Sequence, residues 1–425
     1  MRLMDDTLAI LVGGGPAPGI NGVIASATIE AVNNGLRVLG LYEGYRHIAR
    51  GDTSHVTELT INDVSRIHFT GGSYLRTSRT NPGKDEETLE RCIRSLLQLG
   101  VRYLVCIGGD DTTYGAARIA AKTHGRLGVV TVPKTIDNDL PLPDNAPTFG
   151  FETARAVGTA LVENLMEDAR TAERWYLAVT MGRKSGALAL GICKAAGATL
   201  ACIPEEYEGA HIALDQVVDT IVGSIIKRKS LGQGHGVAMI AEGIAERLDP
   251  QELAAFDSGS RDAYGHIRLA DVPLGMVLRD AVRARLGDLG LGDITVVSKD
   301  IGYELRCAKP VPFDAEYTRT LGYGAVRYLL NGGSGALIAL SGGRVKPVTL
   351  DELIDPATGR IRIRMVDVTT ESYEVARKYM IRLEPSDLEE PRLSRLCVQT
   401  TLSADQFVER FGSTVGSAAE PSAAR

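Results

Sequence analysis

The sequence predicts an α/β protein with two doubly wound, Rossmann-like lobes and a cleft between them. Apolar runs of strand length alternate with helical patterns in both halves of the chain, and this alternation implies right-handed crossovers and a mostly parallel sheet. Glycine-rich loops follow several of the apolar runs, where ligands bind in sheets of this kind. The length of 425 residues suits two or three domains.

The first half of the chain repeats one theme, which is an apolar run, a loop and a helical pattern. Short apolar runs bounded by turn residues are typical of buried strands. We expect such strands over residues 8–12, 37–42, 103–107 and 128–132. Apolar residues at helical spacing predict helices that begin near residue 20, span about residues 85–99 and follow residue 112. Because the strands are expected to be parallel, the loops after them should lie at one edge of the sheet.

The second half continues the pattern. We expect strands over residues 175–180, 237–240 and 294–297. They lead into the segments MGRKSG, AEG and GYELR, and we interpret this half as a second α/β lobe. The small, polar residues of 412–425 predict a flexible tail.

Composition excludes several classes of protein. The 47 basic and 53 acidic residues give a net charge of −6, which argues against general nucleic-acid binding. No apolar stretch is long enough for a membrane-spanning helix, and we expect neither a signal peptide nor a membrane partner. The six cysteines are widely spaced, which argues against a disulfide framework and favours the reducing cytoplasm.

Three loops carry unusual chemistry. The glycine-rich segment 13–19 between a strand and a helix suits anion binding by backbone N–H groups, or is simply a tight turn. Asp110, after two glycines, is either a magnesium ligand or an acidic start of a helix. Asp137 and Asp139 lie two residues apart and would face one side of an extended segment. Such a pair favours a general base, but a plain polar turn remains open.

Basic side chains follow a glycine pair in GGSYLRTSR, where Arg76 and Arg79 suit contact with phosphate. A solvated basic turn is the alternative. None of the seven histidines has the spacing of a known metal-ligand motif.

Seven motifs, taken in order, resemble those of the phosphofructokinase family. They are GGGPAPGIN, GGSYLRTSR, GGDDT, PKTIDND, MGR, AEG and GYELRCAKPVPFD, over about residues 8–330. The resemblance implies transfer of a phosphoryl group to the 1-hydroxyl of fructose 6-phosphate by a homodimer or homotetramer. It implies a donor-phosphate lobe of residues 1–149 with about 306–350, and a sugar-phosphate lobe of residues 150–305 with about 351–411.

The resemblance also implies the roles of site residues. Mg²⁺ would be held at Asp110, and Asp137 would act as the base, aided by Lys134 and Arg79. The implied donor-binding residues are Gly14, Asp111, Thr112 and Lys134. The implied substrate-binding residues are Thr135, Asp137, Arg174, Met181, Gly182, Arg183, Glu242, Tyr303 and Arg306. Of these, Arg174 matches an arginine that a neighbouring subunit lends to the sugar phosphate.

The phosphoryl donor is implied by three positions. ATP-using members of the family generally carry glycine where this chain has Asp111 and Lys134, and the resemblance is to the pyrophosphate-dependent branch. An aspartate would occupy the space of the ATP α-phosphate and repel its charge, whereas an ammonium would neutralise a phosphate leaving group. Tyr303, where ATP users often have histidine, favours the same donor.

The chain departs from the family pattern at several places. Pro16 replaces a common aspartate, Arg76 replaces a common glycine, and Cys307-Ala308 replace two glycines. An arginine expected shortly before Gly302 is absent, and Lys299 is the nearest cation. His266 resembles part of the late motif, but the residues after it do not continue that motif, and we assign it no role.

Three alternatives remain open at this point. One is an ATP-dependent member with an unusual donor loop. Another is a pyrophosphate-dependent kinase with a broader sugar range, including sedoheptulose 7-phosphate. The third is a non-catalytic binding subunit, against which Asp110, Asp137 and Arg183 count.

Overall fold

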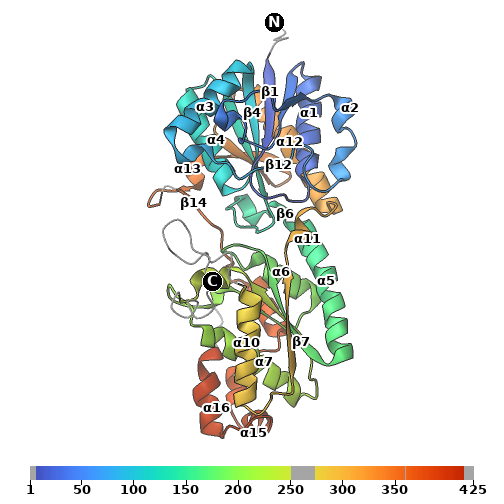
Figure 1. Cartoon of the computed structure of the whole chain (residues 1–425), viewed down its shortest axis with the longest axis vertical. Coiled ribbons are helices and arrows are strands. Elements are labelled where there is room, and N and C mark those ends of the chain that lie inside the picture. Colours follow the sequence, from blue (N-terminus) through green and yellow to red (C-terminus); the bar gives the residue numbers. More distant parts are fainter. Residues whose placement is uncertain (1–5, 250–272, 359, 416–425) are drawn as a thin grey trace. The chain divides into compact units, whose positions relative to one another are not determined.

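The computed structural model describes residues 6–249, 273–358 and 360–415 (Figure 1). Contacts divide the chain into two compact units. The first unit comprises Met1–Val157 and Tyr303–Arg364, and the second comprises Gly158–Gly302 and Met365–Arg425. His266 and residues 416–425 of the expected tail lie outside the described residues, while Gly412–Thr414 form a short 3₁₀ turn.

The first unit is built on an eight-stranded sheet with the strand order β12-β11-β5-β4-β1-β2-β3 and with β6 beside β5. Its strands are β1 (Thr7–Val12), β2 (Arg37–Leu41), β3 (Val56–Glu58), β4 (Val101–Gly108), β5 (Gly128–Thr135), β6 (Phe149–Gly150), β11 (Ala336–Ser341) and β12 (Arg344–Thr349). The pairs from β11 to β2 are parallel, and only the outermost pairs, β11–β12 and β2–β3, are antiparallel. This is the mostly parallel sheet that the sequence predicts.

Helices cover both faces of this sheet. They are α1 (Ile20–Asn33), α2 (Ile61–Val64), α3 (Glu86–Gln98), α4 (Asp110–Thr123), α11 (Tyr303–Arg306), α12 (Pro312–Leu330) and α13 (Leu350–Leu353). Leu8 and Ile10 of β1 pack with residues of α1 and α12, whereas Ala9 and Leu11 pack with residues of α3 and α4. Because successive side chains of a strand face opposite sides, the sheet is doubly wound. A small hairpin of β13 (Ile354–Asp355) and β14 (Arg360–Ile361) follows α13.

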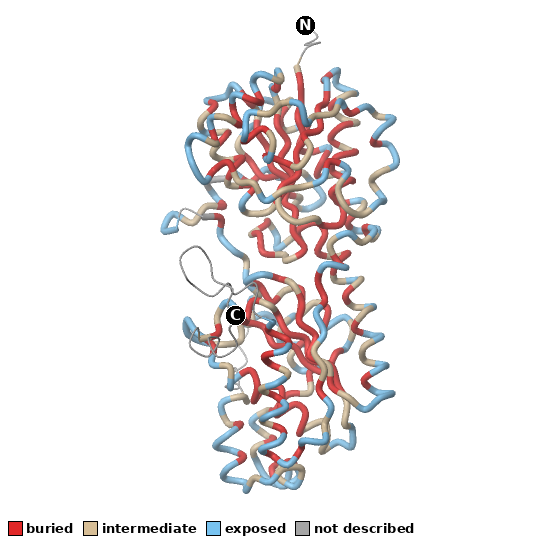
Figure 2. Tube along the Cα trace, viewed as in Figure 1, coloured by how far each residue is buried: buried red, intermediate tan, exposed pale blue. Residues whose placement is uncertain are grey.

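The second unit has a four-stranded, wholly parallel sheet in the order β10-β7-β9-β8. Its strands are β7 (Arg174–Thr180), β8 (Leu200–Cys202), β9 (Gly236–Ala241) and β10 (Thr295–Ile301). Its helices are α6 (Ala187–Ala196), α7 (Leu214–Ser230), α8 (Gly243–Arg247), α10 (Leu274–Asp288), α14 (Glu371–Tyr379), α15 (Arg392–Cys397) and α16 (Ala404–Phe411). Helix α5 (Phe151–Ala172) begins in the first unit and continues into the second. Figure 2 shows the central strands of each unit as buried.

The structure confirms the predicted fold class of two α/β lobes, and each strand that the sequence predicts is present. One local expectation is wrong. Residues 135–139 are not extended throughout, because Asn138 has a φ of 57° and turns the chain. No helix among the described residues has the length and apolar character needed to cross a membrane.

Candidate active site

The three unusual loops of the first unit lie at one edge of its sheet. Strands β1, β4 and β5 are parallel neighbours, with Val12 paired to Ile107 and Gly108 paired to Pro133. The segments that follow these strands therefore leave the sheet side by side at its carboxyl edge. This confirms the prediction, made from topology, that the three loops share one edge.

The glycine turn after β1 is fixed by backbone contacts. The N–H of Gly14 donates to the carbonyl of Ser78 over 2.8 Å, and the Thr77 hydroxyl donates to the Gly14 carbonyl. Gly14 has a φ of 81°, which lies in the left-handed region that favours glycine. A Cβ at this position would also come within 3.0 Å of the Lys134 Nζ, so the turn can approach the lysine only without a side chain.

Lys134 is a buried cation beneath that turn. It is the penultimate residue of β5 and is 5% exposed, and its Nζ donates to the Gly15 carbonyl over 2.6 Å. Burial lowers the pKa of Lys134 to about 8, with a smaller contribution in the same direction from Arg306, while Asp137 and other nearby carboxylates oppose the shift. The ammonium form therefore dominates at neutral pH, close to a turn that can hold an anion.

Asp110 and Asp111 form the first turn of α4, after Gly109 at the N-cap. Asp111 is exposed, and its Oδ1 accepts a hydrogen bond of 3.1 Å from Asn81 Nδ2. Asn81 is itself fixed, because its Oδ1 accepts from the Gly83 N–H over 2.9 Å. Asn81 was not predicted as a site residue, although its Asn-Pro step is typical of a turn. Asn81 determines where the Asp111 carboxylate lies.

Asp110 is half-buried, and its charge raises the pKa of Lys134. Mg²⁺ in proteins usually takes one or two carboxylates together with phosphate oxygens and water. A single carboxylate at a helix start beside an anion-binding turn fits that requirement. The acidic start of a helix, which the sequence left open, is present, because Asp110 lies in the first turn of α4.

Thr112 is buried at the start of α4, beside the glycines that end β4 and follow β1. It is 5% exposed, and a Cβ at Gly13 or Gly108 would each lie 2.3 Å from its Oγ1. The Thr112 side chain therefore fills the space that these two glycines leave. Its evident contribution is to pack the start of α4 against the ends of β1 and β4.

The segment after β5 carries two carboxylates in different surroundings. Asp137 is half-buried, and its N–H donates to Thr135 Oγ1 over 3.0 Å. Asp139 is buried, at 6% exposed. The turn at Asn138 thus separates a half-buried carboxylate from a buried one.

Arg364, which was not predicted as a site residue, holds this segment in place. Its Nε donates to the Asn138 carbonyl and its Nη1 to the Ala146 carbonyl, each over 2.9 Å. Its Nη2 also donates to the Asn138 side-chain oxygen, and its backbone N–H donates to the Asp139 carbonyl over 2.7 Å. Four hydrogen bonds from one residue thus fix the turn that follows Asp137.

We expect Arg364→Met to lower turnover by about 10²-fold, the order of loss seen when a reacting group is displaced by about 1 Å. Guanidinium ion in solution should restore part of the rate of an Arg364→Ala variant. The Arg362→Met variant is the control, because Arg362 is exposed on the same segment. Full activity of Arg364→Met in a steady-state assay would show that the turn needs no such support.

Two arginines of the first unit to which the sequence resemblance assigns site roles, Arg306 and Arg79, differ in position. Arg306 lies on α11 with its guanidinium carbon 3.4 Å from a Cβ built at Gly15, and 5.2 Å from the centre of the Tyr303 ring. The sequence resemblance implies a sugar contact for Arg306, but the structure places it beside the glycine turn. Arg79 is exposed, and within the described residues it has no hydrogen bond or ion pair. Tyr303 is 77% exposed.

The second unit brings its own set together at the carboxyl edge of its sheet. Glu242, directly after β9, accepts hydrogen bonds at Oε1 from the N–H groups of Gly182 and Arg183, over 3.0 and 2.6 Å. Arg183 is exposed with a φ of 50°. A Cβ at Gly302, directly after β10, would lie 2.8 Å from the Met181 side chain. Residues after β7, β9 and β10 therefore form one cluster.

Arg174 lies at the opposite edge of that sheet. It is the first residue of β7 and pairs with Thr295, whereas Met181 follows the last residue of the strand. Seven residues of strand separate the two ends by roughly 20 Å. Arg174 therefore cannot reach the Met181–Arg183 turn of its own chain. Lys299 is exposed on β10, opposite Ala178 and before the carboxyl edge.

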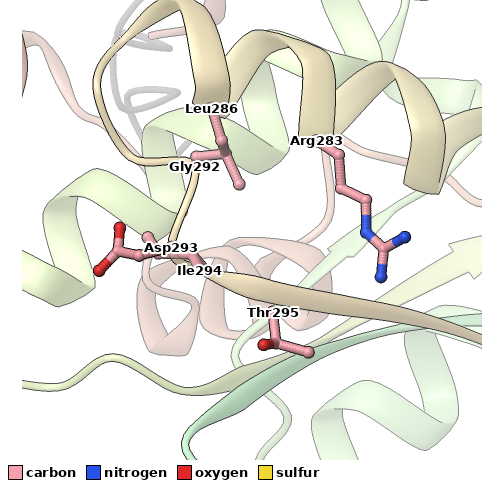
Figure 3. Close-up of a pocket in the computed structure, with 6 residues that line it drawn as sticks. All are labelled: Arg283, Leu286, Gly292, Asp293, Ile294 and Thr295. Carbon is pink, nitrogen blue, oxygen red and sulfur yellow. The ribbon is translucent and has the colours of Figure 1, made fainter.

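Figure 3 shows residues that line a cavity of about 230 Å³ in the second unit. Arg283, Asp293 and Thr295 are among the residues that line it. Thr295 is the first residue of β10, so the cavity lies at the amino edge of the sheet. It has no part in the candidate active site.

A glycine turn, a buried cation and carboxylates at one edge of a doubly wound sheet suit an enzyme that transfers phosphoryl groups. Residues 7–329 match the family model described as Phosphofructokinase. The chain belongs to the phosphofructokinase family.

Two relatives are similar over nearly the whole chain. A protein of Thermotoga maritima named pyrophosphate–fructose 6-phosphate 1-phosphotransferase is 53% identical over 417 residues, which cover 97% of this chain and 99% of that protein. A protein of the same name from Naegleria fowleri is 50% identical over 415 residues, 95% of each chain. The crystal structure of a pyrophosphate-dependent phosphofructokinase from Nitrosospira multiformis matches with a TM-score of 0.65 and 16% identity, over 88% of this chain and 90% of that chain. That likeness shows the fold alone.

Proposed function

We propose that this chain transfers a phosphoryl group from pyrophosphate to the 1-hydroxyl of fructose 6-phosphate, reversibly and with Mg²⁺. The observation that carries the proposal is the buried Lys134 ammonium, which lies under the Gly14–Gly15 turn and close to the start of α4. A fixed cation at that place neutralises a small phosphate leaving group. The names of the two relatives at 50% identity or more support the same donor and acceptor.

The first unit is proposed to bind the donor. Backbone N–H groups of the glycine turn and of the start of α4 face the carboxyl edge of the sheet and suit phosphate oxygens. Lys134, with Arg79 and Arg306, offsets the negative charge of pyrophosphate. Asp111, anchored by Asn81, would repel a further phosphate of a nucleotide, whereas pyrophosphate ends before that point.

Mg²⁺ would be held by Asp110, and it would supply positive charge to the phosphate oxygens. Asp137 is proposed to orient the attacking hydroxyl of the sugar and to accept its proton. Its half-buried carboxylate lies at the same edge as the donor turn, which supports this role. Thr135 fixes the backbone of Asp137 through its hydroxyl.

The second unit is proposed to bind fructose 6-phosphate. Glu242 holds the turn of Met181, Gly182 and Arg183 through Oε1. Its second oxygen takes no part in these bonds and suits a sugar hydroxyl, while the exposed Arg183 suits the phosphate. The spacing of the cysteines supports a cytoplasmic location for this reaction.

The proposal is tested by incubating the chain with pyrophosphate, Mg²⁺ and a panel of sugar phosphates that includes sedoheptulose 7-phosphate. We expect fructose 1,6-bisphosphate and inorganic phosphate in equal amounts, and the reverse reaction from these products. Fructose 6-phosphate should give the highest kcat/KM in the panel. Formation of no sugar bisphosphate with any acceptor would refute the proposal.

The pH dependence of the reaction should report Lys134. Since its pKa is about 8 in the free protein, the cation is lost as the pH rises through that value. We expect kcat/KM for pyrophosphate to fall above about pH 8, with a slope approaching tenfold per pH unit. The Lys134→Met variant should lack this limb. An identical alkaline limb in the variant would assign the titration to another group.

Arg174 supports a homodimer or homotetramer in which one chain completes the sugar site of another. We expect Arg174→Ala and Asp137→Asn chains each to be nearly inactive alone. Unfolded and refolded together, they should regain roughly a quarter of the wild-type rate, because half of randomly mixed dimers are hybrids and each hybrid has one complete site. Mixed chains that stay as inactive as the separate ones would mean that Arg174 serves no neighbouring site.

A further inference from the structure

We propose that His47, Asp52 and His55 form a binding site for a divalent transition-metal ion of the Zn²⁺ class. Nothing in the proposed phosphoryl transfer uses these residues, and the inference does not rest on that function. They lie in the first unit, between β2 and β3. Each of the three side chains offers one ligand atom, and within the described part of the chain these atoms all lie within 4.8 Å of one another.

The ligand atoms converge on one carboxylate oxygen. Asp52 Oδ2 is 2.9 Å from His55 Nδ1 and 3.9 Å from His47 Nδ1. Tetrahedral Zn²⁺ with bonds of about 2.0–2.1 Å separates its ligand atoms by roughly 3.4 Å, so the two distances bracket the required value. Two imidazoles and one carboxylate leave a fourth position for water.

Hydrogen-bond partners orient two of the three ligands. His47 Nε2 lies 3.1 Å from Glu43 Oε2, and a proton on Nε2 donated to this carboxylate leaves the lone pair of Nδ1 directed at Asp52. The other oxygen of Asp52, Oδ1, accepts from the Ser54 N–H and hydroxyl, over 2.9 and 2.7 Å. Carboxylate–histidine pairs and hydrogen-bonded carboxylates of this kind orient ligands in metal sites.

The two imidazole rings set one condition on binding. The His47 and His55 rings are stacked, with centroids 3.6 Å apart and planes 3° from parallel. An imidazole binds a metal ion in the plane of its ring, so one ion can bind both nitrogens only when one ring turns out of the stack. His55 is the more exposed of the two, with 48% of its side chain exposed against 17% for His47, and is the ring expected to turn.

The chemistry of the ligands selects the metal. Imidazole nitrogen suits Zn²⁺, Cu²⁺ and Ni²⁺, whereas Mg²⁺ prefers oxygen ligands. The proposed site at Asp110 and the site at His47 should therefore take different ions. Half of the His55 side chain and about 39% of the Asp52 side chain are exposed, so an ion can enter from solvent.

The test is a titration of the untagged, full-length chain, stripped of metal, with ZnCl₂ in excess Mg²⁺ and without pyrophosphate. We expect one Zn²⁺ per chain by calorimetry, and visible d–d absorption bands when Co²⁺ is used instead. His55→Asn and Asp52→Asn each alter a ligand and should weaken Zn²⁺ binding by about 10–100-fold or more. Glu43→Gln alters only a partner of a ligand and should weaken Zn²⁺ binding by about tenfold. Asp52→Asn keeps an oxygen for the Ser54 bonds.

The control is His211→Ala, which removes an exposed histidine of the second unit and should bind Zn²⁺ as the unaltered chain does. Thermal unfolding of the metal-free variants establishes that they fold, and the exposed position of His55 makes His55→Asn the safest of them. Binding of no Zn²⁺ by the unaltered chain would overturn the proposal. Retention of one Zn²⁺ by folded His55→Asn and Asp52→Asn would overturn it equally, because the ion would then lie elsewhere.

Discussion

The Asp137→Asn variant is expected to lose about 10²–10⁴-fold in kcat, the usual contribution of a positioned general base. Asparagine has the shape of aspartate but cannot accept the proton of the sugar hydroxyl. The local backbone should survive, because the contact to Thr135 uses the Asp137 N–H rather than its side chain. The KM for fructose 6-phosphate should stay within a few-fold, so the loss should appear in kcat. Steady-state kinetics with saturating pyrophosphate measure both quantities.

The matched control for this variant is Asp144→Asn. Asp144 is an exposed aspartate seven positions along the chain, with a φ of 54°, a conformation that asparagine adopts readily. It removes the same charge from the same region without touching the proposed base. A kcat for Asp137→Asn equal to that of Asp144→Asn would remove Asp137 from the proton-transfer step.

The Lys134→Met variant should show the second large effect, a fall of about 10²–10³-fold in the rate with pyrophosphate. Removal of one preorganised group that stabilises charge in a transition state typically has an effect of this size. Methionine fills a similar volume without the charge. Folding should be preserved, because removing a buried ammonium also removes the cost of its desolvation. Rapid-quench measurement of phosphoryl transfer separates this effect from product release.

Lys346→Met provides the comparison, since Lys346 is exposed on β12. It should leave both the rate and the midpoint of thermal unfolding nearly unchanged. If Lys134→Met transfers phosphoryl groups as fast as Lys346→Met, the buried ammonium takes no part in catalysis.

Much of the fold could be predicted from the sequence because its central strands contain continuous apolar runs. All six residues of β1 are buried, and such continuous runs are typical of parallel strands covered on both faces. Seven strands were not predicted: β3, β6, β8, β11, β12, β13 and β14. Five of them are short, with three residues in β3 and β8 and two in β6, β13 and β14. β12, with the sequence RVKPVT, is a polar edge strand that carries a proline. β11, with the apolar sequence ALIALS, carried a strand signal that was overlooked.

The gathering of the donor loops could be predicted as well, since the carboxyl ends of neighbouring parallel strands share an edge. The detailed geometry could not. Asn138 turns the chain where an extended segment was expected, and the arginine that holds this turn is 226 residues further along the sequence. Spacing within a motif carries no information about such a distant partner. The same holds for Asn81 and Asp111, which are 30 residues apart.

The central claim is that Asp111 and Lys134 together select a short inorganic donor over a nucleotide. The most direct test is the ratio of kcat/KM for pyrophosphate to kcat/KM for ATP, measured with fructose 6-phosphate and equal free Mg²⁺. Two like charges near a protein surface at about 4 Å repel by ~4 kcal/mol, less when exposed. We therefore predict a ratio of about 10² or more, which should fall in the Asp111→Gly variant. A ratio near one for the unaltered chain would contradict the account.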